Sequence, residues 1–183
     1  MWDAESNLNS LEDAVEEIES YLLSKDVIRA RSGQASLSIG LISLNLRWLA
    51  QGLESEDQDR LEGIESELAT VRDKWRVAWE RKAAAELRSR LNLWREYLSD
   101  LEGRPGRGSS YPQEVRNRAM AVDLLDAAGN QPEIKSLAAS IDAIDSQLRA
   151  SFQPGEFVWE QVPESAFPSE PFWFLYGRPQ RRN

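Results

Sequence analysis

The sequence predicts an all-α protein, built as an antiparallel bundle of four or five helices with an extended, Pro- and aromatic-rich C-terminal arm. Apolar residues recur at helical spacing nearly everywhere before residue 152. Short segments rich in Gly, Ser and Pro separate these stretches, which is typical of helices that run antiparallel to their sequence neighbours. We therefore expect a helical bundle over residues 1–152 and the C-terminal arm over residues 153–183.

Two helices are expected in the first 52 residues. The first is predicted over residues 10–24, with Ser10 as its cap. Its apolar stripe consists of Leu11, Val15, Ile18 and Leu22. The second is predicted over residues 36–52 and is apolar on nearly all sides, so we expect it at the centre of the bundle.

The longest periodic stretch predicts one long helix over about residues 56–102. Ser55 followed by Gln58 is a capping-box pattern at its start. A continuous helix of this length would extend ~70 Å at about 1.5 Å per residue, which is long for a chain of this size. If the helix bends, Gly63 is the predicted weak point because glycine has a low helix propensity.

Two further helices are predicted after a loop rich in Gly and Arg. The first begins near Tyr111 and ends at Gly129, a residue type that commonly terminates helices. The second is capped by Asn130 and extends to about Phe152. Together with the preceding elements, these complete the predicted bundle.

The composition excludes several classes of chemistry. The chain has 183 residues but no Cys and no His. Thiol catalysis, thiolate zinc sites, serine–histidine triads and carboxylate–histidine di-iron sites are therefore ruled out. The common phosphate-binding loops GxxxxGK[ST] and GxGxxG are also missing. We predict no catalytic residues, no metal site and no cofactor, which favours a non-catalytic protein over an enzyme.

Hydropathy and charge favour a soluble protein. The chain is 41% hydrophobic and 29% charged, and no run approaches the roughly 20 apolar residues of a membrane-spanning helix. The acidic first residues lack the pattern of a secretory signal, and the lack of Cys fits a reducing compartment. We expect a cytoplasmic location and no membrane association.

The C-terminal arm is the first candidate binding element. It contains five prolines, which disfavour a long helix, and seven aromatic residues, which are uncommon in disordered segments. The arm could complete the core of its own bundle, exchange with a second copy of the chain, or dock on another protein. The residues predicted to anchor it on a partner are Trp159, Phe172, Trp173, Phe174 and Tyr176.

A basic segment is the second candidate. The net charge is −9, yet residues 71–118 hold 12 basic and 7 acidic residues. The predicted basic surface consists of Arg72, Arg76, Arg81, Arg88 and Arg95. A nucleic-acid-associated accessory protein could use this basic face of residues 72–118 to neutralise phosphates. Interspersed Asp and Glu, and the acidic chain as a whole, make nucleic acid a less favoured partner than protein.

Acidic residues of the first helix give a third candidate. Glu12 and Glu16 lie one helical turn apart and could reach one Mg²⁺. This spacing resembles the magnesium pattern of all-helical nucleotide pyrophosphohydrolases. Those enzymes carry a second acidic pair on the next helix, whereas residues 32–53 here contain no acid. A Mg²⁺-dependent hydrolase is therefore a second alternative to the leading prediction, a non-catalytic interaction or scaffold protein that self-associates or binds another protein.

Overall fold

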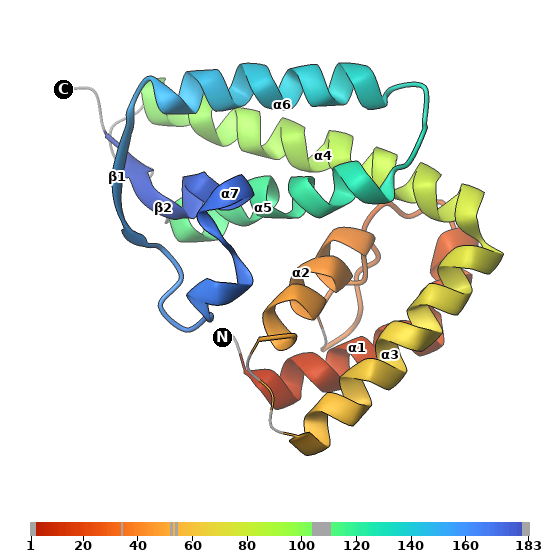
Figure 1. Ribbon diagram of the computed structural model, residues 1–183. Helices are drawn as coiled ribbons and strands as arrows, with labels where there is room; N and C mark the ends of the chain where they lie inside the picture. Colours follow the sequence, from red (N-terminus) through yellow and green to blue (C-terminus); the bar gives the residue numbers. More distant parts are fainter. Residues whose placement is uncertain (1–2, 34, 52, 54, 104–110, 181–183) are drawn as a thin grey trace.

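The computed structural model describes residues 3–33, 35–51, 53, 55–103 and 111–180. The chain is mostly helical, as predicted, but two short strands near the C-terminus form a small sheet that the all-α prediction did not include (Figure 1). The six longer helices are α1 (Ala4–Leu23), α2 (Ile39–Leu49), α3 (Ser55–Lys74), α4 (Arg76–Gly103), α5 (Tyr111–Ala127) and α6 (Ile134–Arg149).

The predicted single helix over residues 56–102 is two helices, α3 and α4, which meet at an elbow at Trp75 (Figure 1). Backbone hydrogen bonds continue through the elbow, because the Trp75 N–H donates to Val71 and the Trp75 carbonyl accepts from Trp79, both at 2.9 Å. Gly63 was the wrong choice for the weak point, since it lies inside α3. The bend lets α3 pack on α1 while α4 packs on α5, so each half buries its own apolar stripe.

Two of the helices begin at residues other than those predicted. The first helix begins at Ala4, and the Asp3 carboxylate caps it by accepting the Ser6 N–H at 2.9 Å, so Ser10 is not the cap. The last long helix begins at Ile134 rather than directly after Asn130. The central helix α2 is capped by Ser38, whose hydroxyl accepts the Leu41 N–H.

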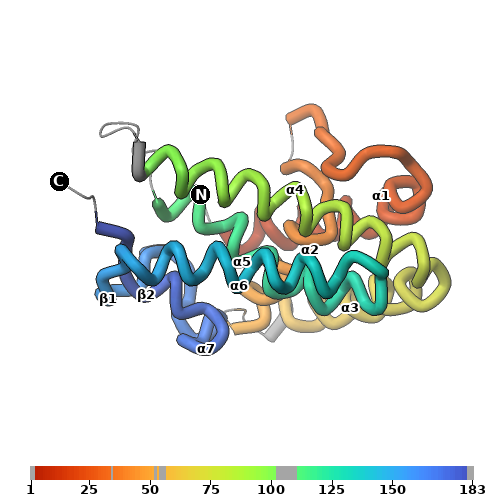
Figure 2. Tube along the Cα trace, turned by 90° about the horizontal axis from the view of Figure 1, so that it is seen from above, coloured from red at the N-terminus to blue at the C-terminus, as the bar shows by residue number. Residues whose placement is uncertain are grey.

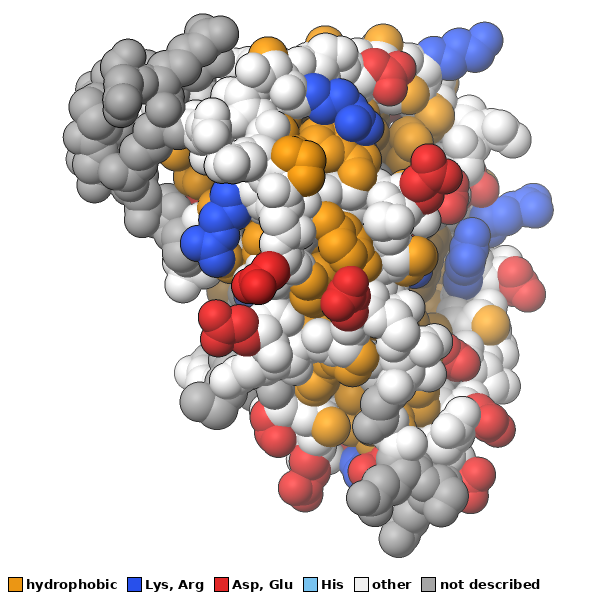
Figure 3. All heavy atoms as spheres, turned by 60° about the vertical axis from the view of Figure 1, so that its left-hand side comes forward, with side chains coloured by type: hydrophobic (Ala, Val, Ile, Leu, Met, Phe, Trp, Pro, Cys, Tyr) orange, Lys and Arg blue, Asp and Glu red, His pale blue; other side chains and the backbone are white. Residues whose placement is uncertain are grey.

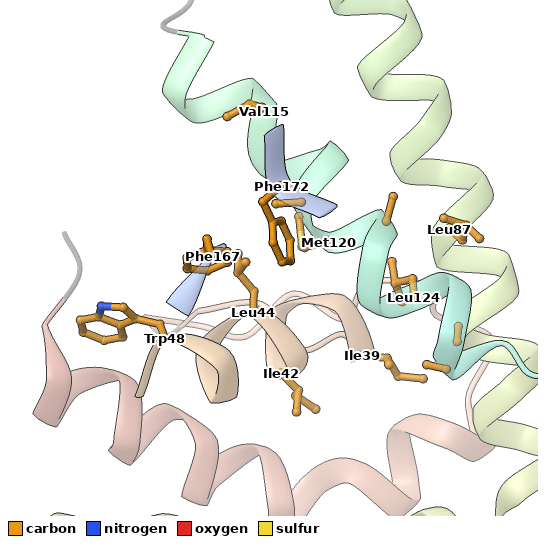
Figure 4. Packing of buried hydrophobic residues seen from close by; sticks show 14 of the residues in the cluster. Ile39, Ile42, Leu44, Trp48, Leu87, Val115, Met120, Leu124, Phe167 and Phe172 are labelled. Carbon is orange, nitrogen blue, oxygen red and sulfur yellow. The ribbon is translucent and has the colours of Figure 1, made fainter. Parts of the chain in front are cut away.

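The hydrophobic core is one continuous cluster that includes residues from all six long helices and from the C-terminal arm. As predicted from its apolar surface, α2 lies centrally and packs on both α1 and α5. Figure 4 shows Leu44 of α2, Met120 of α5 and the arm residues Phe167 and Phe172 packed together. Figures 1 and 2 show α4, α5 and α6 running alongside one another, with the small sheet at one end of these helices.

The C-terminal arm is more structured than an extended segment. Strands β1 (Phe152–Phe157) and β2 (Tyr176–Pro179) pair antiparallel. Between them lie the short turns η1 (Glu164–Ala166), α7 (Ser169–Phe172) and η2 (Trp173–Leu175). Gly177 has a φ of +139° and faces the Gln153 carbonyl, where an added Cβ would lie only 2.2 Å from the oxygen. The pairing of the two strands therefore requires glycine at this position.

Candidate functional site

The arm aromatics predicted to bind a partner pack against the bundle of their own chain. Trp159, Phe172 and Phe174 are buried, whereas Trp173 and Tyr176 are half-buried. Figure 3 shows one face of the molecule, on which apolar side chains are exposed among acidic and basic ones. Burial within the chain gives the first three residues a structural role. A partner-binding role for any of the five stays a prediction.

Three arginines from three different helices cover three consecutive aromatic residues of the arm. Their guanidinium carbons lie 3.7–4.8 Å from the ring centroids, in the pairs Arg47 with Phe172, Arg149 with Trp173, and Arg118 with Phe174. Cation–π contacts of this kind contribute about 0.5–2 kcal/mol each. These contacts attach the arm to α2, α5 and α6 of its own chain.

The five arginines of the predicted basic surface are exposed, but they fall into two groups. Arg81, Arg88 and Arg95 recur every seven residues along α4, and Arg88 forms an ion pair with Glu133 at 2.6 Å. Arg72 and Arg76 lie on either side of the elbow and line one groove together. The structure therefore brings only these two arginines into a shared concave surface.

That concave surface, here called the α2–α3 groove, lies between two helices that run in opposite directions (Figure 1). It consists of two adjoining compartments of about 580 and 370 Å³, which share three lining residues, Leu46, Glu65 and Arg72. One wall is the α2 stripe of Ser43, Leu46, Arg47 and Ala50. The other wall is the α3 stripe of Glu65, Ala69 and Arg72. The end of α5 and the arm residues Ser165, Ala166 and Pro168 complete the rim.

Apolar and small side chains line the inner part of the groove. Leu68 and Trp79 are buried, and Ala127 and Ala166 add little bulk. Trp79 is only 6% exposed, and its indole N–H has no acceptor within the described part of the chain. A buried donor without an acceptor costs about 1–3 kcal/mol. Because this nitrogen is itself buried, it is a feature of the groove floor and offers no donor to a molecule bound in the groove.

Charged side chains of both signs line the groove. Arg47 forms an ion pair with Asp123 of α5, so its charge is neutralised within the wall. By contrast, Arg72, Arg76 and Glu65 are exposed and form no ion pair within the described ranges. Asp126 on the opposite wall is likewise exposed. The groove thus presents cationic and anionic groups that are free to meet a partner's charges.

Sequence reasoning missed this groove, because its walls come from segments that only the fold brings together. The signal available in the sequence was weak. The exposed residues Glu65, Ala69 and Arg72 of α3, and Arg76 at the start of α4, repeat at helical spacing beside the buried stripe. Such a stripe is the usual solvent face of a helix, so it could not identify a binding site by itself.

The carboxylates proposed for Mg²⁺ do not form a cluster in the structure. Glu12 accepts two hydrogen bonds from Arg60, both at 2.9 Å, and this contact raises the pKa of the Arg60 guanidinium. Glu16 is exposed on α1. Among the residues that the structure describes, no group of three or more Asp or Glu side chains could hold a metal ion.

Comparisons with known proteins do not identify a family for this chain. No protein-family model matches the sequence, and neither curated proteins nor solved structures give a significant match. Within the described ranges, no helix combines the length and the apolar character that crossing a bilayer requires.

Proposed function

We propose that this chain is a non-catalytic interaction protein that binds a segment of a partner protein in the α2–α3 groove. The observation that carries the proposal is the set of exposed charges Arg72, Arg76 and Glu65 around an inner surface that includes Leu68 and Trp79. Concave sites with apolar floors and a few polar groups are where proteins commonly bind ligands. Charged residues at the rim then select the partner.

The mixed charge of the groove favours a polypeptide over a nucleic acid. A phosphate backbone carries only negative charge, so Glu65, Asp73 and Asp126 would repel it wherever it passed Arg72 and Arg76. A polypeptide can place a basic side chain beside each carboxylate and an acidic one beside each guanidinium. We therefore expect the chain not to bind oligonucleotides even at low ionic strength. That result would exclude the nucleic-acid alternative.

A random-peptide display selection on the full chain tests the proposal. We expect enriched peptides whose affinity falls at least about tenfold, or 1.4 kcal/mol, when Ala69→Trp fills the groove. Ala69 is exposed, so the substitution leaves the core intact. Ala139→Trp is the matched control, because Ala139 is also exposed but lies on α6, outside the groove.

Two outcomes would contradict the proposal. One is a selection that enriches no peptide on the full chain. The other is a set of peptides that bind the wild-type chain and the Ala69→Trp variant equally well. Turnover of a nucleotide in the presence of Mg²⁺, measured on the same preparations, would replace the proposal with the hydrolase alternative.

A further inference from the structure

We infer that the occupant of the α2–α3 groove is an amphipathic helix that carries a basic and an acidic side chain about two helical turns apart. This inference rests on the proposed function and specifies the partner segment. It follows from the shape of the two walls and from the order of their charges.

The two walls are a pair of neighbouring helices, and a third helix would pack between them. α2 and α3 are consecutive and run in opposite directions (Figure 1). Residues from both helices line the groove. On α2 the lining residues Ser43, Leu46, Arg47 and Ala50 follow the spacing of one helix face. Side chains that repeat with helical periodicity on both walls match the ridges of a third helix, as in helix-in-groove recognition.

Small residues make room for the backbone of that helix. Ser43, Ala50 and Ala69 sit on the two walls, and none of them projects a large side chain into the groove. Leu46 and Leu68 offer apolar contacts between them. An apolar stripe on the occupant can therefore lie on these leucines, with its polar face directed to solvent.

The charges on α3 set the order of the charges on the occupant. Glu65 and Arg72 lie seven residues apart on one helix, which corresponds to about 10 Å along its axis. Arg76 follows one turn later, beyond the elbow. A basic side chain of the occupant would meet Glu65, and an acidic side chain two turns away would meet Arg72.

Two acidic residues, Asp73 and Glu80, line the elbow end of the groove beside the two arginines. Glu80 accepts a hydrogen bond from the Gln131 amide at 3.4 Å and packs against Gly129, so it is already engaged by the loop after α5. Asp73 also lines this end of the groove. Arg72 and Arg76 equal Asp73 and Glu80 in number, so this end of the groove carries charges of both signs, and the two arginines supply its cationic groups.

The enriched display peptides test the inference directly through their sequences and their conformation. We expect them to become helical on binding, as circular dichroism would show, with Lys or Arg about seven positions from Asp or Glu. The double substitution Glu65→Arg and Arg72→Glu exchanges the two charges. It should lower the affinity of the chain for these peptides at least about tenfold. Peptides with the two charges exchanged should regain affinity for that variant.

The control keeps the same net charge. Arg81→Glu combined with Glu96→Arg exchanges one positive and one negative residue at exposed positions of α4 outside the groove, so peptide affinity should not change. Enriched peptides that Ala69→Trp blocks, but that are extended or show no charge order, would overturn the helical occupant and leave the proposed function standing. Failure to enrich any groove-dependent peptide would overturn the proposed function itself.

Discussion

The hydroxyl of Ser38 donates a hydrogen bond of 2.6 Å to the carboxylate of Glu86, although 48 positions separate the two residues in the sequence. Glu86 is fully buried on α4, and it also accepts the Gly40 N–H and the Arg90 guanidinium, both at 2.9 Å. The carboxylate thereby neutralises Arg90 and binds the N-terminal end of α2, where the helix dipole is positive. This contact fixes α2, one wall of the groove, against α4.

Glu86→Ala should strongly destabilise the fold. The substitution leaves the Arg90 guanidinium buried without its carboxylate, and breaking a buried ion pair in this way costs about 3–5 kcal/mol. Urea denaturation of the wild-type chain and the variant measures the difference. Glu96→Ala on the exposed side of the same helix should change stability by less than about 0.5 kcal/mol. Equal stabilities for the two variants would show that the hydrogen bonds and the ion pair of Glu86 contribute little to the stability of the fold.

Gly177→Ala should disrupt the pairing of β1 and β2. At a φ of +139° an alanine is strained, and its Cβ would lie 2.2 Å from the Gln153 carbonyl oxygen, so we expect a loss of more than about 1 kcal/mol. Limited proteolysis should then cut the arm faster. Gly155→Ala is the control, because its Cβ would meet only the Gly177 Cα at 3.7 Å. Unchanged cleavage in Gly177→Ala would contradict this view of the strand pair.

Tyr111→Phe should lower stability at neutral pH and weaken its alkaline dependence. The buried Tyr111 hydroxyl donates to the Phe174 carbonyl at 2.7 Å, and losing that hydrogen bond costs about 1 kcal/mol. Burial raises the pKa of Tyr111 above its ordinary value of 10.0, so the folded chain holds the phenol proton more tightly than the unfolded chain. The resulting stability is complete below pH 10 and is lost as the pH rises through the folded-state pKa.

Denaturation of the wild-type chain and the Tyr111→Phe variant between neutral pH and the alkaline range tests this assignment. The variant should lose less stability above pH 10 than the wild-type chain does. A residual alkaline loss should remain in the variant, because burial also raises the pKa of Tyr21. Identical pH profiles for the two proteins would show that Tyr111 does not control the alkaline transition.

Truncation after Phe152 should abolish cooperative thermal unfolding. The truncated chain loses Trp159, Phe167, Phe172 and Phe174, and each buried aromatic contributes about 1.5–3 kcal/mol. Light scattering after size exclusion, on both chains, gives the oligomeric state at the same time. A dimeric full chain and a folded, monomeric truncation would instead support exchange of the arm between two copies, as the predicted self-association allows.

Hydrophobic periodicity located helices that bury a regular apolar stripe, such as Leu137, Ile141, Ile144 and Leu148 of α6. The pattern could not locate the elbow, since Trp75 continues the apolar spacing and nothing in its neighbourhood resembles a helix terminator. The bend depends on which partner each half packs against, α1 for α3 and α5 for α4. Packing between distant segments is not encoded in local spacing.

The contacts of the aromatic arm and of the basic segment also could not be predicted from local sequence patterns. The aromatic composition argued against a disordered arm, but only the fold shows Arg47, Arg149 and Arg118 covering its aromatic rings. Likewise, the sequence grouped five arginines, whereas the fold places Arg72 and Arg76 in a groove apart from the other three. Chemistry that depends on residues meeting across the fold could not be predicted from the sequence alone.

Amide chemical-shift mapping tests the central claim most directly. The full chain would be titrated with a peptide enriched by display, and the perturbed amides would be assigned. We predict shifts concentrated at residues 43–51, in α2 and just after it, and at residues 65–76 around α3 and the elbow, with smaller changes at 123–127 of α5. Shifts concentrated instead at Trp173 and Tyr176, or along Arg81, Arg88 and Arg95, would contradict binding in the α2–α3 groove.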